Sequence, residues 1–236
     1  MFAIFKREMR AYFVSPIGYI FMAVFLFMSG LLFSLSTFMA KTSSTQSYFS
    51  LLLMIFVIVI PLLTMKLLSE ERKLKTEQIL LTSPVSLSGI VFAKFLAAFT
   101  MFAVTFILSQ ILQFAFLARF AATLNFAEIL GNVIGILLVG AAFIAIGLFL
   151  SSVTESQIIA AISTIGVILF MILLSVVAGY IGNDLLRVSV KWLAVLDRFS
   201  PFTAGIFDLP SVVYYISLTV IFLFLTVRVY EKRRWS

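Results

Sequence analysis

The 236-residue chain contains neither cysteine nor histidine. Without cysteine it forms no disulfide and offers no thiolate, and without histidine it lacks a common metal ligand and the usual general base. Charge is also scarce, because only 11% of the residues are Asp, Glu, Lys or Arg while 63% are hydrophobic. This balance lies well outside the range of soluble domains. Thiol chemistry, imidazole metal sites and serine hydrolysis assisted by histidine are therefore excluded.

In place of charge, the chain has six long stretches without a single Asp, Glu, Lys or Arg. A bilayer core of about 30 Å is crossed by about 20 apolar residues in a helix, so each stretch is sufficient. Continuous rather than alternating apolar runs select helices over a barrel. We predict an all-α polytopic membrane protein, a single domain over 1–236, with six transmembrane helices. Their expected ranges are 17–39, 48–68, 91–118, 129–152, 158–180 and 211–228.

Positive charge is distributed unevenly between the two sides that these helices define. With a cytoplasmic N-terminus, 12 of the 17 Lys and Arg residues lie inside and 5 outside. Positive residues resist translocation, so we expect both termini to be cytoplasmic, in the plasma (bacterial inner) membrane. The net charge of +7 is then topological and does not indicate nucleic acid. The first apolar run exceeds a signal-peptide core, and we expect it to remain as a signal anchor.

Two segments outside the spans are predicted to lie in the membrane interface. Residues 2–13 form an amphipathic helix, and Ser15 and Pro16 suit the cap and first turn of the next helix. Residues 182–210 place basic side chains on one helical stripe and apolar ones opposite, as expected of a helix in the outer interface. The residues expected at the membrane interface are Phe2, Phe5, Lys6, Arg7, Arg10, Arg187, Lys191, Trp192 and Arg198.

The longest segment expected on the cytoplasmic side is 69–84. It opens as a charged helix with Glu71 and Lys75 spaced for an i,i+4 pair, and it breaks at Pro84. The segment is too polar for lipid and too short for an independent domain. A bare solvated loop is the alternative interpretation, although such a loop would need neither the alternating charge nor the break.

Several kinds of chemistry are missing from the motifs. There is no phosphate-binding loop, so the chain is not expected to be an enzyme that hydrolyses ATP by that mechanism. The pair Glu70 and Glu71 does not match intramembrane metalloproteases, because position 75 is Lys and histidine is absent. All ten acidic residues fall at helix ends or in loops, which disfavours an ion-coupled carrier. Any work should therefore come from another subunit.

A few polar and small residues do occur within the apolar runs. Ser109, Gln110 and Gln113 are expected to bind a neighbouring helix rather than a substrate. Gly131 and Gly135 form a G-x-x-x-G pattern, which permits close approach of a second backbone but is common.

Four stretches of the sequence resemble the permeases of ABC-2 type transporters. They are FKREMRAYFVSPIGYI at 5–20, SEERKLKTEQILLTSPVS at 69–86, IGLFLSS at 146–152 and FTAGIFDLPSVVYY at 202–215. Within that family the chain is most similar to the gliding-motility-associated (GldF-like) branch. One departure is Lys75, since the family often has glycine before the threonine of the second stretch. Lysine favours a continuous helix there.

The resemblance implies a six-helix permease that pairs with a second copy or a homologue. It also implies that helices 1 and 5 lie near the interface between the two permeases. Two cytoplasmic ABC ATPase subunits would bind ATP and magnesium, so this chain itself is expected to hold no cofactor. Membrane lipids surround it, and an additional membrane or extracytoplasmic subunit is compatible with the family. The family also allows residues 182–210 to be re-entrant instead of flat. The residues implied in ATPase contact are Glu70, Glu71, Arg72, Lys73, Thr76, Glu77 and Pro84.

The leading hypothesis is the transmembrane permease subunit of an ATP-driven exporter. The alternatives are a secondary carrier with a carbonyl-lined site, and a scaffold that anchors an ATPase or a motility or secretion complex. Co-purification with an ATPase would disfavour the carrier, and nucleotide-dependent transport in liposomes would exclude the scaffold. An apolar path between two permeases suits lipids, peptides and glycoconjugates alike.

Overall fold

The computed structural model describes residues 1–39, 45–76, 86–120, 126–181, 190–192 and 194–234. Within these ranges the regular structure is helical and contains no strand, which confirms the predicted all-α class. The helices are α1 Phe2–Val14, α2 Pro16–Phe33, the π-helix Ser34–Phe38, α3 Gln46–Thr64, α4 Ser69–Lys73, α6 Leu87–Phe120, α7 Phe126–Val153, α8 Gln157–Ala178, α10 Val195–Thr203 and α11 Leu209–Arg234.

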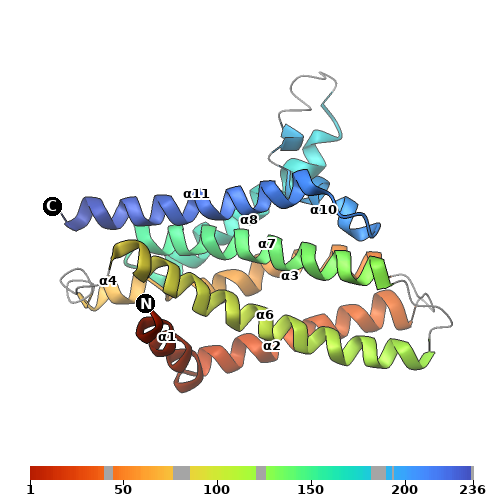
Figure 1. The fold of residues 1–236 in the computed structure, drawn as a ribbon, viewed down its shortest axis with the longest axis horizontal. Helices are drawn as coiled ribbons and strands as arrows, with labels where there is room; N and C mark the ends of the chain where they lie inside the picture. The colour runs from red at the N-terminus through yellow and green to blue at the C-terminus, as the bar shows by residue number, and fades with distance from the viewer. Residues whose placement is uncertain (40–44, 77–85, 121–125, 182–189, 193, 235–236) are drawn as a thin grey trace.

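Among the described residues, six helices are long and apolar enough to cross a membrane, as the sequence predicts. They contain α2, α3, α6, α7, α8 and α11. Figure 1 shows α2, α6, α7 and α11 running along the long axis of the molecule. Both termini lie at one end of this bundle, next to α1 and α4, whereas α10 lies toward the opposite end. We call the end with the termini the charged end.

The turn from α1 into α2 has the geometry that Ser15 and Pro16 predict. The Ser15 hydroxyl accepts a hydrogen bond from the backbone N–H of Ile17 at 3.2 Å, and Pro16 occupies the first turn of α2. At Gly18 a Cβ atom would lie 2.3 Å from the carbonyl oxygen of Tyr12. Only glycine permits this approach, so α1 folds back closely against the start of α2.

The core is an aromatic cluster shared by the central helices. The Phe102 ring packs edge-on against Phe25 and Phe56 at centroid distances of 6.1 and 5.3 Å, and Phe56 meets Phe143 at 6.5 Å. These four rings join α2, α3, α6 and α7. The most apolar windows of α3, α6 and α7 are 61–67% buried, against 28% in α2 and α8 and 11% in α11. The last three helices therefore present most of their apolar surface outward.

A neutral polar cluster lies inside the bundle and joins three helices. The Ser29 hydroxyl of α2 contacts the hydroxyls of Tyr48 at 2.8 Å and Ser109 at 2.6 Å, which belong to α3 and α6. Gln113 donates to Ser29 at 2.8 Å and Gln110 donates to Tyr48 at 2.9 Å. All five side chains are buried. This confirms the prediction that the polar residues of the third span bind neighbouring helices.

The glycines of α7 let other helices approach it. Gly131 and Gly135 face α10, where an added Cβ would lie 3.0 Å from the Phe202 carbonyl oxygen and 2.8 Å from the Phe199 ring, respectively. At Gly147 it would lie 2.3 Å from Oγ1 of Thr64 in α3. The G-x-x-x-G pattern therefore accommodates α10 within the same chain.

Candidate functional site at the charged end

The charged end is built around α4, the five-residue helix Ser69–Lys73. Two glutamates stand in its first turn and two basic residues in its last, the order that complements a helix dipole. The helix ends at Lys73, and Lys75 adopts a φ of 56°, in the left-handed region. The predicted continuous helix through Lys75 is therefore wrong. The backbone instead takes a conformation that favours glycine at this position.

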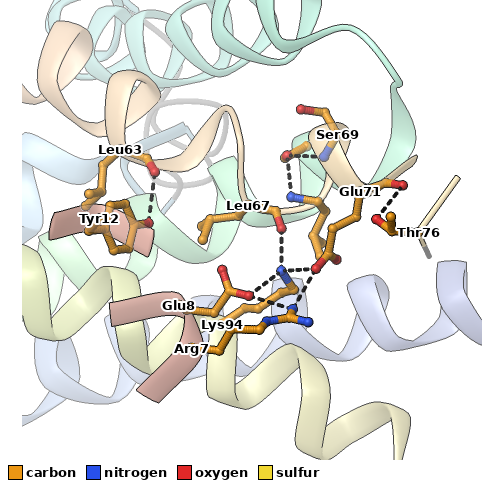
Figure 2. A network of polar contacts seen from close by, with 11 residues as sticks. Arg7, Glu8, Tyr12, Leu63, Leu67, Ser69, Glu71, Thr76 and Lys94 are labelled. Carbon is orange, nitrogen blue, oxygen red and sulfur yellow. Dashed lines mark hydrogen bonds and ion pairs between the residues drawn. The ribbon is translucent and has the colours of Figure 1, made fainter. Parts of the chain in front are cut away.

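Glu71 of α4 faces the inside of the protein, where it meets Lys94 of α6. The Lys94 ammonium lies 2.9 Å from Glu71 and 3.1 Å from Glu8 of α1, and it donates a hydrogen bond of 2.7 Å to the Leu67 carbonyl (Figure 2). The three N–H donors of an ammonium match these three acceptors. Only 1% of the Lys94 side chain is exposed, so these contacts compensate a buried charge.

Arg7 of α1 closes this group into a four-residue ion-pair network, Arg7, Glu8, Glu71 and Lys94. Its Nη2 atom lies 2.8 Å from a carboxylate oxygen of Glu8 and 2.8 Å from one of Glu71 (Figure 2). Burial lowers the pKa of the Arg7 guanidinium, but the two carboxylates outweigh it, so the pKa lies above its ordinary value. Arg7 stays charged, and the network contains two positive and two negative groups.

A second contact holds α1 on the bundle. The Tyr12 hydroxyl donates a hydrogen bond of 3.1 Å to the Leu63 carbonyl near the end of α3 (Figure 2). Burial, assisted by the nearby Glu8 carboxylate, raises the pKa of Tyr12 above its usual range, which keeps the hydroxyl protonated as a donor. The amphipathic helix α1 is therefore attached to both α3 and α4 through polar contacts.

The other side of α4 is attached to the end of α7. Arg72 donates a hydrogen bond of 2.6 Å to the Val153 carbonyl and forms an ion pair of 2.9 Å with Glu155. The Ser151 hydroxyl accepts hydrogen bonds from the backbone N–H groups of Leu68 and Ser69 at 3.2 and 3.1 Å. Basic side chains near a helix C-terminus satisfy its free carbonyls and its dipole. The segment at α4 therefore contacts the end of α7 as well as α1 and α6.

Five of the seven residues that the resemblance implies in ATPase contact are described, and they divide into two groups. Glu71 and Arg72 make the internal contacts described above, with 15% and 29% of their side chains exposed. Lys73 and Thr76 are exposed, and Glu70, 41% exposed, lies 3.9 Å from Lys66. The remaining two, Glu77 and Pro84, lie outside the described residues.

The residues expected in the membrane interface also occupy different positions. On α1, Phe2, Lys6 and Arg10 are exposed and Phe5 is half-buried, whereas Arg7 takes part in the ion-pair network. Exposed residues at the opposite end of the bundle include Lys191 and Trp192, and the Arg198 guanidinium lies 5.0 Å from the Trp192 ring centroid. Arg187 lies outside the described residues.

Part of the predicted interfacial segment 182–210 is α10, which packs on the bundle. Its residues Phe199 and Phe202 are buried, and the Tyr215 hydroxyl of α11 donates a hydrogen bond of 2.9 Å to the Val195 carbonyl. Glu128, at the start of α7, accepts hydrogen bonds from the Thr45 hydroxyl and backbone N–H at 3.1 and 3.2 Å. Among the described residues, apolar packing and hydrogen bonds therefore help to hold this end together.

The sequence alone did not predict the ion pairs of Lys94. It placed this residue only among the positive charges on the cytoplasmic side. One signal was available: Lys94 stands in the apolar sequence VFAKFLAAF at 91–99, several residues into a span. A lysine in that setting is either at the membrane surface or paired within the protein. Choosing between these needs the rotation of α6 about its axis, which the sequence does not supply.

A family model described as "ABC-2 family transporter protein" matches residues 33–230, well over half of the chain. No curated protein matches the chain. The matched range includes α4 and Lys94 but not α1, which contributes Arg7 and Glu8 to the network. A domain of this family is the membrane component of an ABC transporter and is not itself the ATPase. With its six apolar helices, the chain is a multi-pass permease that belongs to the ABC-2 transporter family.

Proposed function

We propose that the chain is the permease subunit of an ATP-driven exporter and that a separate ATPase docks on the exposed part of α4 and the turn after it. The single observation that carries this proposal is the two-sided placement of α4. Lys73, Lys75 and Thr76 are exposed, whereas Glu71 and Arg72 of the same short segment make ion pairs within the bundle. A partner on the exposed side would move helices that it does not touch.

The internal contacts define the expected path of that movement. Through Glu71 it reaches Lys94 of α6 and Glu8 of α1, and through Arg72 it reaches the end of α7. We expect two ATPases, each binding ATP and magnesium, to act on two permeases at their cytoplasmic ends. Both termini would then be cytoplasmic in the plasma membrane, as the uneven distribution of positive charge favours. The gliding-motility-associated branch is our proposal from the resemblance carried by the four sequence stretches at 5–20, 69–86, 146–152 and 202–215.

The second permease, a copy or a homologue, would pack along α2 and α8, the first and fifth spans. Both helices, like α11, leave most of their apolar surface uncovered within the chain, and the resemblance favours α2 and α8 among the three. Because the chain lacks cysteine, single-cysteine variants give an unambiguous test. We expect Ile162→Cys in α8 to form a disulfide between two copies. A native mass with one permease per functional complex would contradict this arrangement.

Docking is tested by reversing charge only on the exposed side of α4. In the double variant Lys73→Glu with Lys75→Glu, we expect ATPase retention on the purified permease to fall about tenfold or more, because individual rim charges contribute little but several reversed charges repel a partner. The matched control is Arg119→Glu with Lys191→Glu, which makes the same charge change at the opposite end. Equal retention in both double variants would contradict docking at α4.

Coupling is tested by changing the internal side of α4. The variants Glu71→Gln and Arg72→Gln keep the exposed residues, so we expect the ATPase to remain bound while nucleotide-dependent transport in liposomes falls. Loss of the ATPase together with transport would assign these residues to docking instead. An ATPase that binds the parent protein without any nucleotide-dependent transport would support the scaffold alternative.

A further inference from the structure

Helix α1 packs on the bundle with one face and leaves the other uncovered within the described part of the chain. On the packed face, Ile4, Phe5 and Met9 contact the hydrophobic core and Tyr12 is buried. The uncovered face contains four exposed side chains, which we call the outward stripe: Phe2, Lys6, Arg10 and Phe13. At about 100° per residue, these four positions fall within about 80° of the helix circumference. The stripe is therefore one continuous surface that a partner outside the chain can reach.

The two aromatic rings of the outward stripe lie on the side where the first span begins. The Phe13 ring packs edge-on against Tyr19, in the first turn of α2, at a centroid distance of 6.2 Å, and both rings are exposed. Phe2 lies about 20° from Phe13 around the helix. Figure 1 shows that α1 does not continue the line of α2 but crosses the end of the bundle. Exposed aromatic rings beside the start of a span are typical of the membrane interface, so we expect α1 to run along the headgroup region.

The outward stripe carries positive charge that no acidic residue of α1 offsets. Lys6 and Arg10 stand about 40° apart on the helix surface, next to the aromatic rings. Within the described residues neither takes part in an ion pair. The single acidic residue in the sequence of α1 is Glu8, which is 13% exposed and is paired with Arg7 and Lys94. The stripe therefore offers two accessible cations beside two apolar rings.

We propose that the outward stripe binds an anionic phospholipid, of the phosphatidylglycerol type, in the leaflet at the charged end. The Lys6 ammonium and the Arg10 guanidinium contact the anionic headgroup, while Phe2 and Phe13 lie at the boundary between headgroups and acyl chains. In phosphatidylcholine a quaternary ammonium offsets the charge of the phosphate, so the two cations favour the anionic lipid. One basic residue near an anionic surface contributes a preference of about fivefold. The stripe is separate from the exposed side of α4, so this proposal can fail while ATPase docking stands.

The lipid next to α1 is identified by quenching of one tryptophan with lipids that are brominated on their acyl chains. The reporter is Phe13→Trp in the full-length chain with both native tryptophans replaced, Trp192→Phe and Trp235→Phe, in liposomes of phosphatidylglycerol and phosphatidylcholine. Quenching in mixtures where only one of the two lipids is brominated gives their relative binding constant at this position. We expect phosphatidylglycerol to be preferred about fivefold or more, and about 1 M salt to lower this preference. Equal binding of the two lipids would overturn the proposal.

Two double variants of the reporter test whether the stripe causes the preference. Lys6→Gln with Arg10→Gln removes both cations, and the two lipids should then bind equally. The matched control, Arg119→Gln with Lys191→Gln, removes the same charge from exposed positions at the opposite end and should keep the preference. A preference that survives the loss of Lys6 and Arg10 would overturn the proposal. So would a loss of ATPase retention in that variant at unchanged lipid preference, because the stripe would then bind the ATPase and not the lipid.

Discussion

Two of the buried polar clusters in the described part of this membrane protein, the ion-pair network and the Ser29 cluster, are built differently. At the charged end, Lys94 and its partners join α1, α4 and α6 through full charges. Within the bundle, the Ser29 cluster joins α2, α3 and α6 through neutral hydroxyl and amide groups. Removing one partner of a buried ion pair costs about 3–5 kcal/mol, whereas a hydrogen bond between membrane helices contributes about 0.6 kcal/mol on average.

The comparison indicates a division of roles along the bundle. A neutral cluster fixes which helices lie side by side and changes little when one bond is lost. A buried charged network holds its helices in one arrangement and penalises an arrangement that leaves Lys94 unpaired. α4 belongs to the charged network, which suits the role proposed for it in transmitting a movement from an ATPase.

The largest effect is expected from breaking the charged network at its centre. Lys94→Met leaves Glu8 and Glu71 without their buried partner, and it should lower the free energy of unfolding by about 3–5 kcal/mol. Thermal unfolding in detergent measures the change. Adding Glu71→Gln to Lys94→Met leaves Arg7 balanced by Glu8, so it removes the uncompensated charge and should recover much of the loss. A double variant no more stable than Lys94→Met would show that packing, and not charge, holds this end together.

The next effect tests whether close packing supports the charged end. Gly147→Ala places a Cβ atom 2.3 Å from Thr64 Oγ1 in the native geometry, so α3 and α7 must separate. Overpacking of this kind costs about 1–3 kcal/mol. Gly166→Ala in α8 is the control, since no atom of the described residues lies within 4 Å of its added Cβ. The account fails here if both variants unfold at the same temperature.

A smaller effect is expected in the neutral cluster. Ser29→Ala removes a hydroxyl that contacts Tyr48, Ser109 and Gln113, and it should cost about 1–2 kcal/mol. The control is Ser163→Ala, because within the described part of the chain the Ser163 hydroxyl contacts carbonyls of its own helix, at Ile159 and Ala160. Thermal unfolding of the two variants gives the difference. A loss as large as that of Lys94→Met would remove the distinction between the two polar groups.

The smallest expected change in the free energy of unfolding is at the turn after α4. Unlike the others, it is an increase in stability. Lys75 has a φ of 56°, and glycine relieves the left-handed strain while making the unfolded chain more flexible. We expect Lys75→Gly to stabilise the protein by about 0.5–1 kcal/mol. Lys73→Gly, within α4, should instead destabilise it by about 1 kcal/mol. If Lys75→Gly also lowers Tm, the turn observed at Lys75 is not the stable conformation.

The sequence alone predicts the six membrane-spanning helices. It does not predict the ion pairs of the charged end. Apolar runs without charge identify all six helices because lipid imposes the same requirement on every residue of a span. The ion pairs of Lys94 join residues 86 and 23 positions apart in the chain, and no local pattern encodes such a distance. Glu71 and Lys75 show the limit of local spacing, since a pair expected on one helix is replaced by contacts with α1 and α6.

The most direct test of the docking role of α4 is site-specific photo-crosslinking in native membranes. A photoreactive residue at position 76 should form an adduct with an ATPase that contains a phosphate-binding loop, identified by mass spectrometry. The same residue at position 119, at the opposite end of the bundle, should form none. An ATPase adduct at 76 alone is the predicted result; no adduct at 76, or equal adducts at both positions, would contradict the account.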